Sequence, residues 1–278
     1  MLAEAVKYAA ARLRGQADPH GHLAQQVAIW ARHKRHSAAW GPHLARAKAL
    51  ALASARACPE HARRTALVLG PGLLLDVPLD ELAALFQKVV LADMAFVPEV
   101  RAKAARLGNV QALEVDLTGR LGLLAGAVDG ALDGALDGRA SGLALVAARL
   151  PELDFVYSAN LLSQLPLFAL DAVSAGLPTA LPPGMVQQRR AELAADLVRQ
   201  HLDGLKALPC PACLVTDVTE RGLRQGALDY EVDLLFGVEP GLTGETWTWD
   251  LAPDGEAVRG LDVQRVVLGV SDIRTATV

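Results

Sequence analysis

The chain has few of the features that point to export or to a membrane. It contains only three cysteines among 278 residues, too few for a disulfide framework, so we expect a reducing compartment. No run of about 18 consecutive apolar residues occurs, which argues against a membrane-spanning helix. The opening segment MLAEAVKYAAARLRG carries charged residues at helical spacing, a pattern that differs from a signal peptide. The sequence therefore predicts a cytoplasmic protein.

The chain also lacks an excess of charge of either sign. The formal net charge is -4 and the isoelectric point is near 6.0, which gives no general attraction for nucleic acid or an anionic membrane. A hydrophobic content of 52% and a mean hydropathy of +0.25 suit a well-packed soluble core. The length fits one large α/β domain with an appendage, or two small domains.

Two regions of different pattern follow one another. Residues 1–62 are rich in Ala, Leu, Arg and His and predict helices, with a break near residues 16–22. From Thr65 onward, short apolar runs alternate with helical segments. We therefore expect an N-terminal helical cap over residues 1–62 and an α/β domain over residues 63–278.

Seven strands are expected in the second region. They cover residues 66–69, 89–92, 110–115, 153–160, 213–217, 245–252 and 263–273. Helical segments such as 78–88, 97–108 and 185–205 separate the first five, which predicts a doubly wound parallel sheet. No helix separates the last two, so they should pair antiparallel as a C-terminal hairpin.

A glycine-rich stretch over residues 125–142 contains tandem Asp-Gly-Ala-Leu units. Carboxylates spaced along a turn can coordinate calcium. However, the spacing matches no EF-hand loop, and Asp-Gly pairs are common in turns. A repetitive surface insertion is the preferred interpretation.

Polar or glycine residues follow each of the five parallel strands. They are Gly70 and Gly72, Asp93, Asp116, Ser158 and Asn160, and Asp217. Ligands of doubly wound sheets bind outside the carboxyl ends of the strands, and a glycine there lets a ligand approach the backbone closely. Asp93 lies 21 positions after Gly72, near the spacing of about 20 residues at which an acid accepts hydrogen bonds from a ribose. A tight turn that binds no ligand is the alternative.

This layout resembles the class I S-adenosylmethionine-dependent methyltransferases over roughly residues 65–278. The resemblance implies S-adenosylmethionine as the cofactor, with the turn from Gly70 to Gly72 facing its amino-acid part. It further implies that Asp93 binds the ribose hydroxyls, that Asp116 meets the adenine amine, and that Met94 packs on the adenine face. The antiparallel hairpin after the fifth strand is also a feature of that family.

A nicotinamide dinucleotide fold is the nearest competing interpretation, because the same strand, turn and acid occur there. Its fingerprint requires glycine at position 75, where this chain has leucine. The chain also differs from the methyltransferase pattern, with Val68 where an acid is common and Leu74 in place of a third glycine. The three leucines at 73–75 predict a bulkier turn than usual.

The segment after the fourth strand, YSANLLSQLP, supplies further candidates. Amino-methylating members of the resembled family often carry Asn or Asp followed by Pro-Pro and an aromatic residue there, and this chain keeps only the polar position. We expect Asn160 and Gln164 to orient a polar group of the substrate, and Ser158 to lie beside the transferred methyl group. A helix-capping role for Ser or Asn is an equal alternative.

Methyl transfer requires in-line positioning and, for some nucleophiles, a base. Asp217, at the end of the fifth strand, is the best-placed candidate base by strand order. A structural ion pair between Asp217 and a nearby arginine is the alternative interpretation.

Six of the seven histidines lie within the first 61 residues. Helical spacing places His33 and Trp40 near one face and His36 toward one edge. We expect this helix to pack over the cofactor domain and to present His33, His36 and Trp40 to a substrate. A basic, aromatic lid of this kind would favour an anionic substrate. A histidine pair that shares a metal and a solvated basic face are the alternatives, and we predict no metal site.

Cys210 and Cys213 have the spacing of a redox or zinc motif. The second half of a zinc site is missing, and the pair lies at the entry to a strand instead of a helix start. Two buried, inert thiols are the favoured interpretation.

The combined prediction is a doubly wound α/β methyltransferase that acts on a small anionic or polar molecule, without a membrane or nucleic-acid partner. The alternative is a binding or regulatory protein that keeps the fold, and perhaps its ligand, without catalysis. The incomplete glycine turn and the missing aromatic motif favour that alternative.

Overall fold

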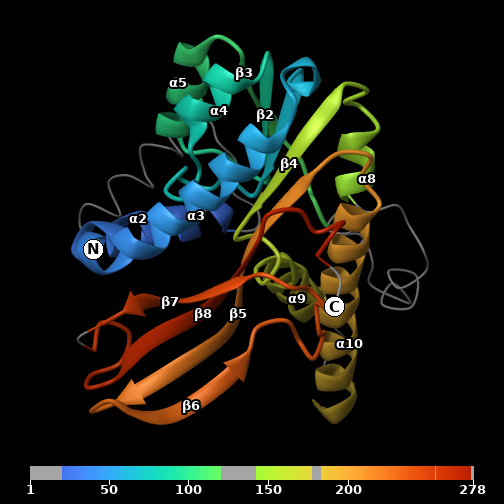
Figure 1. Ribbon diagram of the computed structural model, residues 1–278. Coiled ribbons are helices and arrows are strands. Elements are labelled where there is room, and N and C mark those ends of the chain that lie inside the picture. The colour runs from blue at the N-terminus through green and yellow to red at the C-terminus, as the bar shows by residue number, and fades with distance from the viewer. Residues whose placement is uncertain (1–20, 120–141, 177–182, 254, 277–278) are drawn as a thin grey trace.

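A computed structural model describes residues 21–119, 142–176, 183–253 and 255–276 (Figure 1). Its helices are α2 (His22–Arg35), α3 (Ser37–Ala57), the 3-10 helix η1 (Glu60–Ala62), α4 (Leu79–Leu85), α5 (Pro98–Leu107), α8 (Gly142–Ala147), α9 (Leu165–Gly176) and α10 (Pro183–Lys206). Its strands are β1 (Thr65–Leu69), β2 (Lys88–Asp93), β3 (Val110–Glu114), β4 (Leu153–Ala159), β5 (Ala212–Arg224), β6 (Ala227–Asp233), β7 (Glu245–Ala252) and β8 (Asp262–Val270).

The described strands form one sheet in the order β3-β2-β1-β4-β5-β8-β7, with β6 paired to β5 (Figure 1). The first five strands in this order, β3, β2, β1, β4 and β5, run parallel to one another. Strand β8 pairs antiparallel with both β5 and β7. The predicted doubly wound parallel sheet with a C-terminal antiparallel hairpin is therefore confirmed, and it is the fold that the resemblance implied.

The prediction of seven strands was wrong by one. Strand β5 continues to Arg224, far beyond the predicted end at 217, and turns into the additional strand β6. The turn consists of Gln225 and Gly226, both with positive φ (52° and 80°), as in the two-residue hairpin turns that match strand twist. Strand β6 is exposed along almost its whole length, so it carries no alternating burial signal in the sequence.

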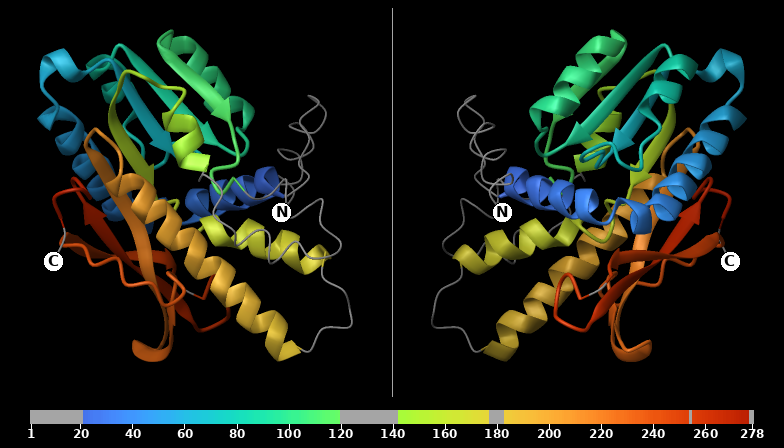
Figure 2. Two further views of the ribbon diagram at one scale, coloured as in Figure 1. Left: turned by 90° about the vertical axis from the view of Figure 1, so that its right-hand side faces the viewer. Right: turned by 90° about the vertical axis from the view of Figure 1, so that its left-hand side faces the viewer.

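Helices cover both faces of the sheet, which gives three layers (Figures 1 and 2). Alternate residues of a strand point to opposite faces, and in β1 Ala66 and Val68 join the hydrophobic cluster that contains α3, α4 and α5. Leu67 and Leu69 join the cluster on the other face, with α8 and α10. The whole of β1 is buried, so its apolar run reflects burial on two sides.

Local sequence signals set the helix ends. Helix α5 begins with Pro98 at its first turn, and Gly108 follows it with φ 73°, which matches the expected order of proline at the start and glycine at the end. The structure confirms this helix, and it confirms the long helix predicted over 185–205 as α10. Both helices carry the chain between neighbouring parallel strands.

The helices expected in the N-terminal region are present from His22 onward. Helices α2 and α3 meet at His36, and α3 packs against β7. Trp40 is the main anchor: its side chain is 2% exposed, its Nε1 donates to the Leu251 carbonyl at 3.0 Å, and its ring meets Trp249 edge-on at 4.9 Å. The predicted packing of this helix by its tryptophans is confirmed for Trp40.

Three further expectations from the sequence concern the cysteine pair, the Asp-Gly stretch and membrane-spanning helices. Cys210 and Cys213 are buried free thiols, and burial raises their pKa values to about 11 and about 12, which confirms the interpretation as inert thiols. The Asp-Gly stretch lies outside the described residues, apart from Gly142. Within the described segments, no helix has the length and apolar character needed to cross a membrane.

Helix α3 packs so closely on the sheet that Gly269 of β8 has no room for a side chain. A methyl group there would lie 2.6 Å from both Leu50 Cδ2 and Trp247 Cζ3. We expect Gly269→Ala to lower the free energy of unfolding by about 1–3 kcal/mol, measured by urea denaturation. Gly184→Ala is the control, since Gly184 is an exposed residue of α10, a methyl group there meets nothing within 4 Å, and the change favours a helix by about 0.5–1 kcal/mol. Equal midpoints for the two variants would contradict this packing.

Candidate functional site

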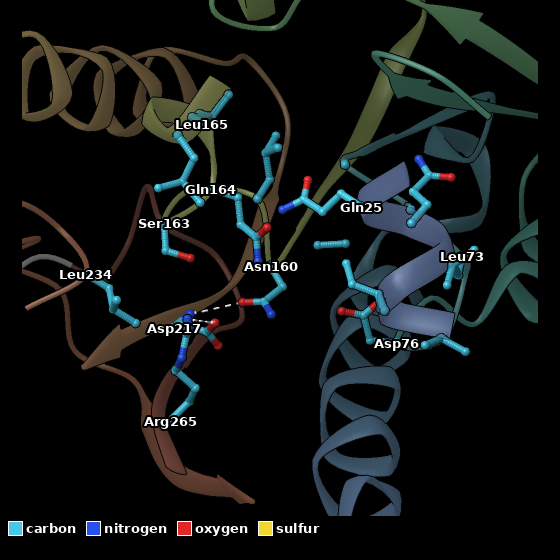
Figure 3. A pocket seen from close by; sticks show the side chains of 18 of the residues that line it. Gln25, Leu73, Asp76, Asn160, Ser163, Gln164, Leu165, Asp217, Leu234 and Arg265 are labelled. Carbon is cyan, nitrogen blue, oxygen red and sulfur yellow. Dashed lines mark hydrogen bonds and ion pairs between the residues drawn. The ribbon is translucent and has the colours of Figure 1, made fainter. Parts of the chain in front are cut away.

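A cleft of about 550 Å³ lies at the carboxyl edge of the sheet (Figure 3). Its walls come from the turns after β1, β2, β3 and β4, from Asp217 within β5, from helices α2, α3 and α9, from the end of β6 and the segment after it, and from strands β7 and β8. Small-molecule sites usually measure about 300–1,000 Å³. The cleft has the size of a ligand site and lies where a doubly wound sheet binds its ligands.

The turn after β1 has the backbone shape that the glycines predicted. Gly70 has φ 66°, and a Cβ there would lie 2.8 Å from Leu161 Cβ. Gly72 has φ 47° and faces open space. Leu74, which stands where the resembled family has a third glycine, adopts φ 62°, a conformation that costs a leucine about 1–2 kcal/mol. Leu73 and Leu75 form part of the cleft wall and leave the cleft open.

Asp93 ties this turn to the end of β2. Its Oδ2 accepts the Gly72 N–H at 3.0 Å, and its Oδ1 accepts the Met94 N–H at 2.8 Å. Burial raises the pKa of the Asp93 carboxyl to about 6, although the two backbone hydrogen bonds oppose the shift. Asp93 and Met94 both line the cleft.

Asp116 follows β3 and lies in the same cleft. Its Oδ1 accepts hydrogen bonds from the Thr118 backbone N–H at 2.9 Å and from the Thr118 hydroxyl at 2.6 Å. These bonds fix the carboxyl group in a local turn. The structure thus brings Gly72, Asp93 and Asp116 together in one cleft, as the sequence predicted.

Asn160, which directly follows β4, meets Asp217, which lies within β5. Asn160 has φ 49°, and its Oδ1 accepts the backbone N–H of Asp217 at 3.0 Å. A non-glycine residue in this region of φ is strained and often functional. Both residues line the cleft, so the structure places the two predicted catalytic residues side by side (Figure 3).

The Asp217 side chain is 1% exposed and has one charged partner. Arg265 Nη1 donates to its Oδ2 at 2.9 Å, and Arg265 Nη2 lies 2.6 Å from Glu220 Oε2. Burial raises the pKa of Asp217 to about 6, although Arg265 and the nearby Asn160 side chain oppose the shift. The alternative of an ion pair with an arginine therefore holds for one of its two carboxylate oxygens.

Sequence reasoning missed several residues of the cleft. Asp76 lines it, and burial raises the pKa of its carboxyl to about 6. Arg265, Trp249 and Gln26 line it as well. Only Asp76 had a visible signal, because it is an acid directly after the apolar leucines of the turn; the others depend on how distant segments pack.

Ser158 is the clearest correction. It was expected beside the transferred methyl group, but its side chain is fully buried, is absent from the cleft lining and hydrogen bonds to His201 Nε2 at 3.0 Å. Burial lowers the pKa of His201 to about 4, so the ring is neutral. Strand alternation turns Ser158 toward α10, away from the cleft. Gln164 does line the cleft, as expected.

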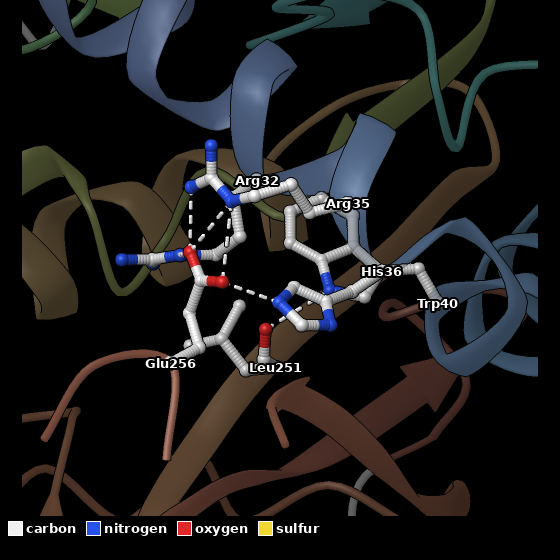
Figure 4. A network of polar contacts seen from close by, with 6 residues as sticks. All are labelled: Arg32, Arg35, His36, Trp40, Leu251 and Glu256. Carbon is white, nitrogen blue, oxygen red and sulfur yellow. Dashed lines mark hydrogen bonds and ion pairs between the residues drawn. The ribbon is translucent and has the colours of Figure 1, made fainter. Parts of the chain in front are cut away.

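The basic residues near the start of α3 do not form a free lid (Figure 4). His36 Nε2 contacts Glu256 Oε2, and Arg35 Nη2 lies 2.5 Å from Glu256 Oε1. The hydrogen bonds from Arg35 and His36 lower the pKa of Glu256 to about 2. His33 lies beside Trp40, with ring centroids 5.6 Å apart. Of the three residues predicted to face a substrate, only Trp40 lines the cleft.

Comparisons with known proteins give only distant likenesses. No family model and no curated protein matches the chain. Among solved structures, Burkholderia thailandensis 1,6-didemethyltoxoflavin-N1-methyltransferase with bound 1,6-didemethyltoxoflavin and S-adenosylhomocysteine is 14% identical, covering 92% of each chain at a TM-score of 0.30. A DhpI complex with SAH is 16% identical, covering 90% of this chain and 98% of that chain at a TM-score of 0.32. The fold assignment rests on the strand order of this chain itself.

Asp217 makes the stability depend on pH in the direction opposite to that of a carboxylate whose pKa is lowered by an ion pair. Its pKa is about 6 in the folded chain against 3.8 as the ordinary value, so between these values the folded state binds the proton more tightly. Raising the pH through this window therefore destabilises the native chain relative to Asp217→Asn, by on the order of 2 kcal/mol. Urea unfolding at about pH 4 and about pH 7.5 measures the difference.

The control for this measurement is Asp203→Asn, which alters an exposed carboxylate on α10. Its stability relative to the native chain should change little between the two pH values. If the stability of Asp217→Asn relative to the native chain is also the same at both pH values, burial does not raise the pKa of the Asp217 carboxyl.

Proposed function

We propose that the protein transfers a methyl group from S-adenosylmethionine to a small polar molecule. The observation that carries this proposal is the convergence of the Gly70–Gly72 turn, Asp93 and Asp116 on one cleft at the carboxyl edge of the sheet. The two acids and the open backbone at Gly72 match the three parts of such a nucleoside: ribose, base and amino-acid chain. A cleft of about 550 Å³ is large enough for a cofactor of this kind together with part of an acceptor.

In this proposal each residue has a definite role toward the cofactor. Gly72 lets its amino-acid part approach the backbone, because no Cβ stands in the way, and Gly70 supports this turn by leaving room for the Leu161 side chain. Asp93, already fixed by the Gly72 and Met94 amides, retains lone pairs for the ribose hydroxyls. Asp116 accepts from the adenine amine, and Met94 covers the adenine face.

The bound cofactor would supply an activated methyl group, and the chain would position an acceptor against it. Asp217 is the proposed base, because its buried carboxylate faces the same cleft. Asn160 is the proposed catalytic partner, since it holds the Asp217 backbone and lines the cleft. Gln164 and Trp40 form the proposed acceptor wall.

We further propose that α2 and α3 act as a cap on this site, and that the protein works in the cytoplasm without a nucleic-acid partner. Helix α2 supports the first point, since Gln25, Gln26 and Ile29 line the cleft. The isoelectric point near 6.0 and the small number of cysteines support the second.

Calorimetric titration with S-adenosylhomocysteine tests the cofactor assignment. We expect the native chain to bind it and Asp93→Asn to bind at least about tenfold more weakly, since a hydrogen bond to a charged group contributes about 1.5–3 kcal/mol. Asp80→Asn is the matched control, because Asp80 is an exposed acid on α4 that pairs with Lys103, and its affinity should equal that of the native chain. Equal affinities for native and Asp93→Asn would refute the site.

The same titration with NAD separates the competing fold. Binding of NAD without binding of the sulfur nucleoside would favour the nicotinamide alternative, which Leu75 at the third glycine position argues against. A catalytic protein should also convert S-adenosylmethionine to S-adenosylhomocysteine and release it when a methyl acceptor is added. A protein that binds the cofactor but releases none with any acceptor would be the non-catalytic alternative.

A further inference from the structure

Unpartnered buried polar atoms are concentrated in the cleft. In the parts of the chain that the structure describes, six buried side-chain polar atoms have no hydrogen-bond partner, and all six belong to residues that line the cleft. They are Gln26 Oε1, Arg32 Nε, Ser163 Oγ, Asp217 Oδ1, Trp249 Nε1 and Arg265 Nε. Most buried polar atoms in proteins are paired, so a cleft that collects six such atoms is built to bind a polar ligand.

The end of the cleft around Asp217 has an excess of carboxylates. Arg265 is the cation at this end, and it is already bound by Asp217 and Glu220. Asp76 lies on the opposite side, with Asn160 between the two (Figure 3). Asp217 and Glu220 therefore bind the guanidinium group at this end, while Asp76 adds a further carboxyl group on the opposite wall, so an additional carboxylate from a ligand would be repelled.

The other basic groups near the cleft do not reverse this balance. Lys48 lowers the pKa of Asp76, but it is not among the residues that line the cleft. Arg32 lines the cleft, but its Nε lies 3.7 Å from Glu256 Oε1. His43 also lines the cleft, and burial lowers its pKa to about 4, so the ring is neutral near pH 7. Its Nδ1 accepts the Trp247 indole N–H at 3.1 Å.

Apolar side chains surround this polar end. Trp249, with the His43 ring stacked on it at 4.1 Å, forms one part of the wall, and Leu234, Phe236 and Leu251 form others. The Trp249 side chain is 8% exposed, so its unpartnered Nε1 is a buried donor. A ligand here would bury an apolar body and place a polar group against Asp217.

We infer that the Asp217 end of the cleft binds a neutral or cationic N–H or O–H nucleophile carried on an apolar body, and that it rejects carboxylates. This inference rests on the proposed methyl transfer and names its acceptor class. Asp217 Oδ1 is the acceptor of the nucleophile's proton, and the Trp249 indole N–H binds an acceptor atom of the body. Asn160 positions Asp217 through the backbone N–H of that residue.

The transfer balances with these groups alone. A lone pair on the acceptor nitrogen or oxygen forms the new bond to the methyl carbon, and the carbon–sulfur bond breaks with its electrons remaining on sulfur. One proton of the N–H or O–H group passes to Asp217 Oδ1, and a cationic ammonium gives up this proton before it attacks, because only the free amine has a lone pair. With a neutral amine or hydroxyl, the positive charge of the sulfonium and the negative charge of the carboxylate both disappear, which suits a buried site. With an ammonium, one positive charge remains on the methylated product.

Three probes of one size test this inference: phenethylamine, 4-ethylphenol and phenylacetate. They share an apolar ring and differ in carrying an ammonium, a hydroxyl or a carboxylate group. Each is titrated into the full-length protein saturated with S-adenosylhomocysteine, and its dissociation constant is measured by saturation-transfer NMR. We expect the amine or the phenol to bind at least about tenfold more tightly than phenylacetate, and the comparison of those two identifies the nucleophile.

Asp217→Asn should abolish this preference while S-adenosylhomocysteine still binds, because the cofactor contacts lie at β1, β2 and β3. Asp203→Asn should leave the preference unchanged. If Asp217→Asn fails to fold, Asp76→Asn replaces it and should reduce the preference at the opposite wall.

Phenylacetate binding as tightly as the other probes, a preference that survives in Asp217→Asn, or no binding of any probe would each overturn the inference. Failure of the native chain to bind S-adenosylhomocysteine is a separate result. It would overturn the proposed function instead.

Discussion

The carboxylate of Asp93 is the contact on which the shape of the cleft depends. It joins the turn after β1 to the end of β2 by accepting the Gly72 N–H, and the neighbouring Gly70 N–H continues the strand ladder to the Ala92 carbonyl at 2.9 Å. The parallel register of β1 and β2 sets both bonds. The glycine turn is therefore held open by the adjacent strand, and the other walls are arranged around it.

Strands whose residues carry a local pattern, or are buried along their length, could be predicted from the sequence. Strands β1, β2 and β4 were found because both of their faces are buried, which gives continuous apolar runs. Strand β6 was missed, since it is exposed and pairs only with an extension of β5. Its one local signal was the Gln-Gly turn. The face of the sheet toward which Ser158 points could also have been predicted, because Val156 and Ser158 lie on the same face of β4.

Contacts between distant segments could not be predicted. Arg265 reaches Asp217 because the antiparallel register of β5 and β8 places Glu220 opposite Arg265, and no local pattern specifies that register. Likewise, Glu256 binds Arg35 and His36 across more than 200 positions. A basic helix was visible in the sequence, but the acid that neutralises it was not. The electrostatic character of the cleft thus comes from tertiary pairing, and it differs from what the basic N-terminal helix suggested.

The residues that line the cleft come from both early and late parts of the chain, so the two halves of the cleft are synthesised at different times. Gly72 and Asp93 lie on the first two strands and the turn between them, whereas Trp249 and Arg265 lie on the last two strands, with β8 inserted between β5 and β7. During synthesis, chains emerge from the N-terminus onward. The half that we propose binds the nucleoside can form while the ribosome is still adding residues, but the half that we propose selects an acceptor cannot exist until translation has passed β8.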